Sequence, residues 1–97
     1  MKKIEDCVVK RKGHTEHYDS KKVYASVYAA ALSCHYSETK SEKIADKITS
    51  KINSWIKVEV KNKKCVLSYS IRDKVYENLN KIDKDVALMY KHHLDLS

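Results

Sequence analysis

Three basic side chains near the N-terminus have the spacing of an anion-binding site. Lys10 and Arg11 are adjacent cations at the end of a predicted strand, and Lys22 follows in the first turn of a predicted helix. Free backbone N–H groups and the dipole at the start of a helix attract anions. If a hairpin folds over that helix start, three cations and a helix end suit a triphosphate better than a carboxylate. Ordinary surface lysines on an edge hairpin are the alternative.

A hairpin is predicted to carry the first two cations. The segment 7–11 has β-branched residues leading into the basic pair, which is typical of a short strand. Lys12 and Gly13 predict a two-residue turn, because glycine adopts the positive φ that a type I′ turn requires. Residues 14–18 would form the returning strand.

Helices are predicted for most of the remaining chain, which has no proline and one glycine. Asp19 or Ser20 would cap a helix over 21–34, since either side-chain oxygen can accept from the first free N–H groups. The segment 39–42, Thr-Lys-Ser-Glu, matches a capping box. A helical stripe follows it, formed by Ile44, Ile48, Ile52 and Trp55.

The second half of the chain predicts a basic loop and two more helices. The alternation over 58–67 is interrupted by Lys61-Asn62-Lys63-Lys64, so we expect a basic loop within 57–64 and leave a short third strand open. Ser68 or Ser70 would cap a third helix that buries Ile71, Val75 and Leu79. A fourth helix from Asp83 to about His93 would bury Val86 and Met89, with either Tyr90 or His93.

These elements predict an α+β fold that is mainly helical. An N-terminal β-hairpin would pack on a bundle of about four helices, because a hairpin alone is barely stable in water. A chain of 97 residues supports one hydrophobic core, so residues 1–97 are predicted to form a single domain.

Charge and composition limit the functions that the chain can have. The net charge of +7, from 20 Lys and Arg against 13 Asp and Glu, attracts nucleic acid, a nucleotide triphosphate, an anionic membrane face or an acidic partner. Charge alone does not choose among them. The single glycine excludes the glycine-rich phosphate loops GxxxxGK[ST] and GxGxxG.

Neither a metal centre nor a catalytic group is predicted. The three cysteines, Cys7, Cys34 and Cys65, form no CxxC pair, so reduced cytoplasmic thiols are expected. His14 and His17 would point to opposite faces of a strand, which argues against a shared metal. We find no catalytic arrangement of Ser, His and Asp, no signal peptide and no apolar stretch that could span a bilayer. A non-enzymatic protein of the cytoplasm is expected.

Three segments resemble the ATP-cone family. The run Val8-Val9-Lys10-Arg11-Lys12-Gly13, then Glu16, Tyr18, Asp19 and Lys22-Val23, is similar to the family's first signature, V-x-K-R-x-G-x-x-E-x-F-[DN]-x-x-K-[IV]. Residues 68–75 resemble the second signature, a Ser or Thr followed by I-x-x-x-V. Residues 86–90 resemble the final helix, V-A-x-x-Y. The resemblance covers 8–90 with its three motifs in order.

Some positions depart from the family pattern. Lys12 and His14 replace the commoner residues around the glycine, which adds charge without disturbing the turn. Tyr18 replaces the usual Phe. The family often ends in a Tyr-Arg pair followed by basic residues, whereas this chain continues after Tyr90 with Lys91, two histidines and Leu94-Asp95. A phosphate contact by Lys91 is therefore in doubt.

The resemblance implies a regulatory nucleotide-binding module without catalytic machinery. ATP-cones occur in ribonucleotide reductases, in the reductase-gene repressor family and in some archaeal kinases, where ATP or dATP sets activity or assembly state. Carried over by position, Val8, Glu16 and Asp19 would face the adenine. The groups implied to hold phosphates or ribose, with Mg²⁺ on the nucleotide, are Lys10, Arg11, Lys22, Ser68 and Arg72.

The resemblance also implies partners for the chain, and two alternatives to nucleotide binding stay open. The resemblance implies a homo-oligomer or a protein partner, plausibly linked to ribonucleotide reductase activity or expression, and no membrane. The first alternative is a small basic nucleic-acid-binding regulator that uses the hairpin and the segment 57–64. Repressors of the family carry a four-cysteine zinc ribbon before the cone, which this sequence does not show. The second alternative is a degenerate cone that keeps the fold without its ligand.

Overall fold

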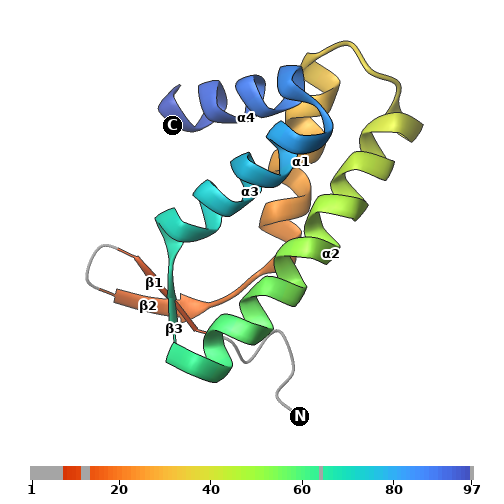
Figure 1. The fold of residues 1–97 in the computed structure, drawn as a ribbon. Coiled ribbons are helices and arrows are strands. Elements are labelled where there is room, and N and C mark those ends of the chain that lie inside the picture. The colour runs from red at the N-terminus through yellow and green to blue at the C-terminus, as the bar shows by residue number, and fades with distance from the viewer. Residues whose placement is uncertain (1–7, 12–13, 64, 97) are drawn as a thin grey trace.

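Four helices and three strands make up the fold. The computed structural model describes residues 8–11, 14–63 and 65–96, so the predicted turn at Lys12 and Gly13 lies outside the described residues. The elements follow one another as β1 (Val8–Arg11), β2 (His14–His17), α1 (Ser20–Ser33), α2 (Glu38–Lys63), β3 (Cys65–Leu67), α3 (Ser68–Ile82) and α4 (Lys84–Leu96). Figure 1 shows the strands at one end of the helices. The predicted α+β fold, mainly helical with an N-terminal hairpin, is confirmed.

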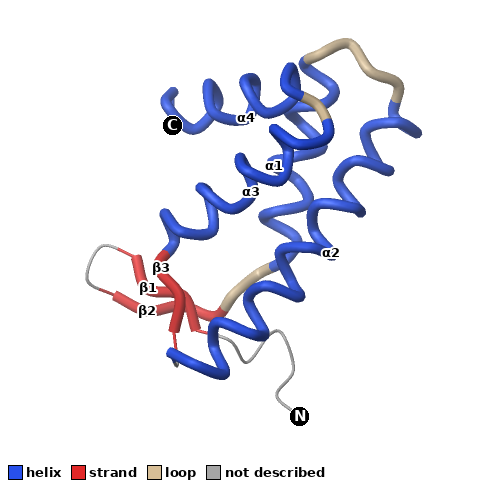
Figure 2. The backbone as a smooth tube through the Cα atoms, viewed as in Figure 1, coloured by secondary structure: helices blue, strands red, loops and turns tan. Residues whose placement is uncertain are grey.

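The strands form one sheet in the order β2-β1-β3. β1 and β2 are antiparallel, with Val8 opposite His17 and Arg11 opposite His14. β3 is parallel to β1, with Val8 opposite Cys65. Parallel strands need a long crossover connection, and α1 and α2 supply it here. Because β3 leads directly into α3, the start of α3 lies beside the hairpin (Figure 2).

The start of α1 is fixed by the residues that join it to β2. Asp19 is the N-cap, and its Oδ1 accepts from the backbone N of Lys21 at 2.9 Å. The hydroxyl of the buried Tyr18 donates to Oδ1 of Asn53 on α2 at 2.8 Å. Of the two predicted caps, Asp19 and Ser20, the structure confirms Asp19. The Tyr18 bond ties the β2–α1 junction to the longest helix.

One hydrophobic core lies between the helices and reaches the sheet at Val66. Ile48, Ile52 and Ile56 of α2 are fully buried, as are Val27 of α1 and Leu79 of α3. On α4, Val86, Ala87 and Tyr90 are buried, Met89 is half-buried and His93 is exposed, which decides between the two predicted alternatives.

The predicted basic loop within 57–64 is wrong over most of its length. α2 continues to Lys63, because Ile56 and Val60 extend the buried i, i+4 stripe through the lysine-rich segment. Local charge therefore did not end the helix. The short third strand that the sequence left open exists as β3.

Two predicted helix caps are also wrong. At the start of α2, Ser37 Oγ accepts from the backbone N of Lys40 at 3.1 Å, in place of the expected capping box at 39–42. Ser41 of that box is fully buried, and its hydroxyl has no hydrogen-bond partner within the described residues. The N-cap of α3 is Leu67, without a side-chain hydrogen bond, so neither Ser68 nor Ser70 caps that helix.

Asp83 joins the start of α4 to the loop between α1 and α2. Its Oδ1 accepts from the backbone N of Asp85 at 3.1 Å and of Val86 at 3.2 Å, and its Oδ2 accepts from the Tyr36 hydroxyl. Burial by itself raises the pKa of the Asp83 carboxyl. The hydrogen bonds from Tyr36, Val86 and Asp85, together with the charge on Lys40, lower that pKa below its ordinary value.

This arrangement predicts that Asp83→Asn destabilises the protein at neutral pH and much less in acid. Asparagine still caps a helix, so the substitution tests the charge. A carboxyl whose pKa is lowered on folding stabilises the fold fully above its unfolded pKa of about 3.9. That stabilisation is lost as the pH falls through the lower folded pKa. In thermal melts, the difference in melting temperature between wild type and variant should therefore be smaller below pH 3 than at pH 6.

Tyr36→Phe provides the matched control, because it removes the hydroxyl that donates to Asp83. We expect it to lower the free energy of unfolding by about 1 kcal/mol at pH 6, and by less when residue 83 is already Asn. If the difference in melting temperature between wild type and Asp83→Asn does not change with pH, the charge on Asp83 does not stabilise the fold, which would contradict this prediction.

Candidate functional site

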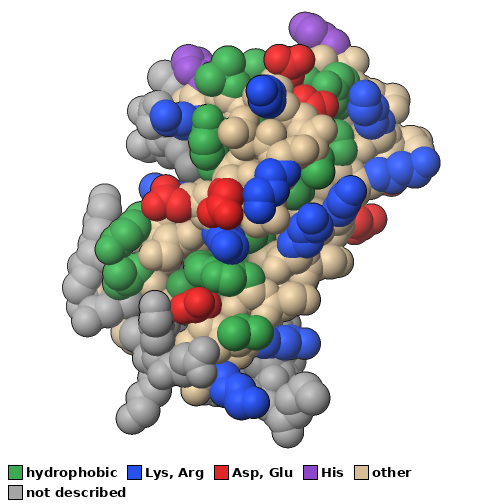
Figure 3. Space-filling view, viewed as in Figure 1, with side chains coloured by type: hydrophobic (Ala, Val, Ile, Leu, Met, Phe, Trp, Pro, Cys, Tyr) green, Lys and Arg blue, Asp and Glu red, His purple; other side chains and the backbone are tan. Residues whose placement is uncertain are grey.

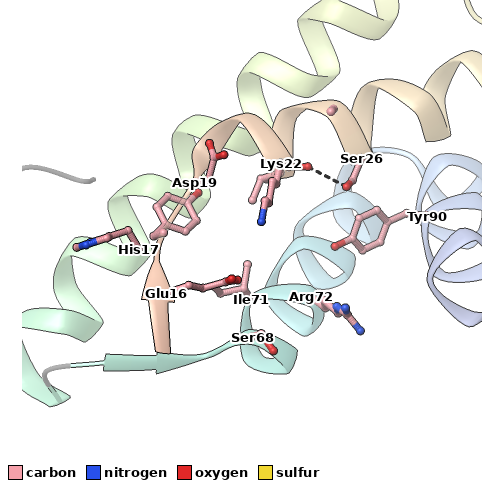
Figure 4. Close-up of a pocket in the computed structure, with 12 residues that line it drawn as sticks. Glu16, His17, Asp19, Lys22, Ser26, Ser68, Ile71, Arg72 and Tyr90 are labelled. Atoms are coloured by element: carbon pink, nitrogen blue, oxygen red, sulfur yellow. Dashed lines mark hydrogen bonds between the residues drawn. The ribbon is translucent and has the colours of Figure 1, made fainter. Parts of the chain in front are cut away.

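A cavity opens where β2, the starts of α1 and α3, and α4 come together (Figure 4). Its volume is about 390 Å³, within the range of about 300–1,000 Å³ that is usual for small-molecule sites. Polar or charged side chains make up seven of the twelve lining residues, and two tyrosines with three aliphatic residues supply the apolar surface. The lining residues are Glu16, His17, Tyr18, Asp19, Lys22, Val23, Ala25, Ser26, Ser68, Ile71, Arg72 and Tyr90.

The cavity brings together five of the eight residues that the sequence predicted for the site. Glu16 comes from β2, Asp19 from the junction, Lys22 from α1, and Ser68 and Arg72 from α3. The two halves of the site are far apart in the sequence. The parallel pairing of β1 with β3 is what places them side by side.

The other three predicted residues, Val8, Lys10 and Arg11, lie on β1, and their side chains are outside the described part of the chain. Their backbone positions are known, since Lys10 is opposite Thr15 and Arg11 is opposite His14. β1 is therefore paired along its length with the strand that supplies Glu16. Ligand contacts by all eight residues stay predictions.

The lining side chains differ in direction. Glu16, Lys22 and Tyr90 point into the space between β2 and α4, whereas His17 points away from it (Figure 4). Asp19 uses its Oδ1 to cap α1, so its Oδ2 is the carboxylate oxygen that takes no part in the cap. Glu16 is half-buried, and Lys22 is exposed.

The N-terminus of α3 has the features that favour a bound anion. Leu67 makes no side-chain cap, and no acidic residue lies in the first turn. The first N–H groups of the helix therefore lack a side-chain acceptor from the cap position, while the helix dipole favours negative charge there. Ser68 adds a hydroxyl and Arg72 adds a guanidinium one turn later, both at the cavity wall. α1 differs, because the carboxylate of Asp19 already accepts from the backbone N of Lys21 in its first turn.

Tyr90 is a cavity residue that the sequence analysis placed only in the core. Its side chain is 5% exposed, and its ring lines the cavity beside Arg72. Burial raises the pKa of Tyr90 to about 12; Arg72 opposes this rise and Asp73 adds to it. The hydroxyl is therefore a neutral donor at physiological pH. The motif V-A-x-x-Y was the sequence signal that marked this position.

The described residues form neither a cluster of metal ligands nor a helix that could span a membrane. Over residues 8–11, 14–63 and 65–96, no group of three or more His, Cys, Asp or Glu side chains is placed to hold a metal ion. None of the helices in this part of the chain combines the length and apolar character needed to span a bilayer.

Comparison with known proteins identifies the family of the chain. Neither the curated proteins nor the solved structures gave a match. The sequence model of the ATP cone domain matches residues 6–92, which include every residue that lines the cavity. This match covers nearly the whole chain, and the chain belongs to the ATP-cone family.

Proposed function

We propose that this chain binds ATP or dATP, with Mg²⁺ on the phosphates, in the cavity between β2, α1, α3 and α4. The bound nucleotide acts as a regulatory signal and is not converted. The observation that carries this proposal is the meeting of Glu16 and Lys22 with Ser68 and Arg72 in one cavity, although the two pairs are more than 40 residues apart in the sequence. Family membership supports the ligand class.

The phosphates of the nucleotide would lie at the start of α3. This helix end has free N–H groups, the hydroxyl of Ser68 and the charge of Arg72, and Lys22 approaches from α1. Anion binding at a helix N-terminus needs no glycine-rich loop, which this sequence lacks. The family pattern adds Lys10 and Arg11 to the same end.

The adenine would lie toward β2. Glu16 and Asp19 carry carboxylates that can accept hydrogen bonds from the exocyclic amine of adenine, and Val23 and Ile71 supply apolar surface. Guanine presents a carbonyl at the corresponding position, which a carboxylate repels. The family pattern places Val8 against the same ring.

The signal would leave the cavity through α4. Tyr90 lines the cavity, while Leu88, two residues earlier, is 64% exposed on the outer surface of the helix. A ligand shifts an assembly equilibrium only if it binds one state better than the other. We propose that the nucleotide controls self-association or docking to a protein partner, with ribonucleotide reductase or the expression of its genes as the system that the family suggests.

ATP or dATP with Mg²⁺ should stabilise the protein in thermal melts. A ligand present at 100 times its dissociation constant adds about 2.7 kcal/mol to the free energy of unfolding. Lys22→Ala should weaken binding, whereas Lys21→Ala should not, because Lys21 is an exposed neighbour outside the cavity wall. If millimolar adenine nucleotide gives no stabilisation, the chain is a degenerate cone.

Glu16→Ala should narrow the preference for ATP over GTP. Loss of a charged acceptor costs about 1.5 kcal/mol, or about tenfold in ATP affinity. GTP affinity should rise, because the carboxylate no longer repels the guanine carbonyl. Calorimetric titration of both nucleotides measures the ratio, with Glu42→Ala on the exposed side of α2 as the control. Equal losses for ATP and GTP would show that Glu16 does not contact the base.

Leu88→Lys should abolish nucleotide-dependent assembly and leave the nucleotide affinity of the unassembled protein unchanged. The exposed leucine lies outside the nucleotide cavity, so the substitution affects a docking surface on α4. Light scattering coupled to gel filtration, with and without ATP or dATP, gives the assembly state. If wild type and Leu88→Lys have the same mass with and without nucleotide, the nucleotide does not control self-association. Docking to a separate protein partner would then be favoured.

A further inference from the structure

The solvent side of α2 carries a stripe of lysines. Blue side chains follow the course of this helix in Figure 3. Six lysines of α2 have exposed side chains and are called the lysine stripe: Lys40, Lys43, Lys47, Lys51, Lys57 and Lys61. At 1.5 Å per residue and about 100° per residue, the stripe is about 32 Å long and covers an arc of about 120°.

The charges of α2 are sorted by sign. Lys43, Lys47 and Lys51 follow one another at a spacing of four, and Glu38, Glu42 and Asp46 do the same beside them. Like charges at this spacing destabilise a helix, whereas alternating signs would stabilise it. A helix face that serves only solubility gains nothing from this arrangement. The sorting therefore indicates a polyanionic partner for the lysine stripe.

Within the described residues, the lysine stripe forms no ion pair. None of its six lysines makes an ion pair with another described residue, whereas Lys74 and Lys81 on α3 each lie 3.7 Å from Glu77. Lys40 lies over the ring of Tyr36 at 3.9 Å, and its charge also helps to lower the pKa of Asp83. The other five exposed lysines give the stripe its positive potential toward solvent.

We propose that the lysine stripe binds the phosphate backbone of double-stranded nucleic acid. Its length is close to one turn of a duplex, about 34 Å, and lysines four apart are separated by about 6 Å along the helix axis. Ser50 and Ser54 are exposed between the lysines and can donate to phosphate oxygens. A rigid helix that is packed on the core holds these donors in place before the duplex arrives.

A membrane surface fits α2 less well. Helices that lie on bilayers insert an apolar face among the lipids. The apolar face of α2 is already in the core, through Ile48, Ile52 and Ile56, and the exposed large hydrophobic residue on α2 is Val58. The nucleotide cavity is also separate, because none of its lining residues belongs to α2. Duplex binding therefore does not depend on the proposed nucleotide function.

The salt dependence of binding to duplexes of about 20 base pairs tests the proposal, with one DNA arm and one RNA arm. The logarithm of affinity should fall linearly with the logarithm of salt, with a slope of about −0.9 per phosphate contact on B-DNA. Lys47→Gln/Lys51→Gln should reduce that slope by about 1.8 and lower affinity at least tenfold at low salt. The fluorescence of Trp55, the single tryptophan and half-buried on α2, reports binding.

Lys21→Gln/Lys84→Gln is the matched control, since it removes the same charge from exposed positions on α1 and α4. Both double variants should keep the circular dichroism spectrum and the nucleotide affinity of the wild-type protein. If the two variants lose duplex affinity equally, the loss depends on net charge and not on the lysine stripe, which would overturn the proposal. Binding to phosphatidylserine vesicles or to polyglutamate, but not to a duplex, would overturn it as well.

Discussion

The pairing of β3 with β1 is the constraint on which the rest of the structure depends. This short parallel contact joins the N-terminal strand to a strand in the second half of the chain, and it sets the start of α3 beside the hairpin. Together with the helix packing, it brings Glu16 and Lys22 to the same cavity as Ser68 and Arg72. The three residues of β3 thus help to form the cavity, and Val66 at their centre is buried in the core.

Much of the fold followed from local chemistry. The i, i+4 spacing of Ile44, Ile48 and Ile52 identified α2, and the carboxylate of Asp19 identified the start of α1. The predicted order of elements is confirmed for the same reason, because amphipathic stripes and turn residues act within a few positions of each other. Five of the eight predicted site residues share a cavity because the family signatures place them in the first turns of helices or next to them.

The wrong predictions concern features that depend on tertiary packing. The lysines of 57–64 suggested a loop, yet burial of Ile56 and Val60 keeps that segment helical, so packing outweighed local charge. Ser41 looked like part of a cap and instead faces the core. The parallel register of β3 could not be predicted from the sequence either, because pairing between distant strands leaves no local pattern.

The central position of β1 has a consequence for the order of folding. β1 is the first strand to be synthesised, but its second neighbour arrives only after α1 and α2 are complete. Contacts between distant segments form slowly, because the intervening chain must lose its freedom first. The antiparallel pair α1 and α2 can therefore assemble early around its isoleucines, while closure of the sheet comes late. The candidate nucleotide cavity is then the last feature that a newly made chain completes.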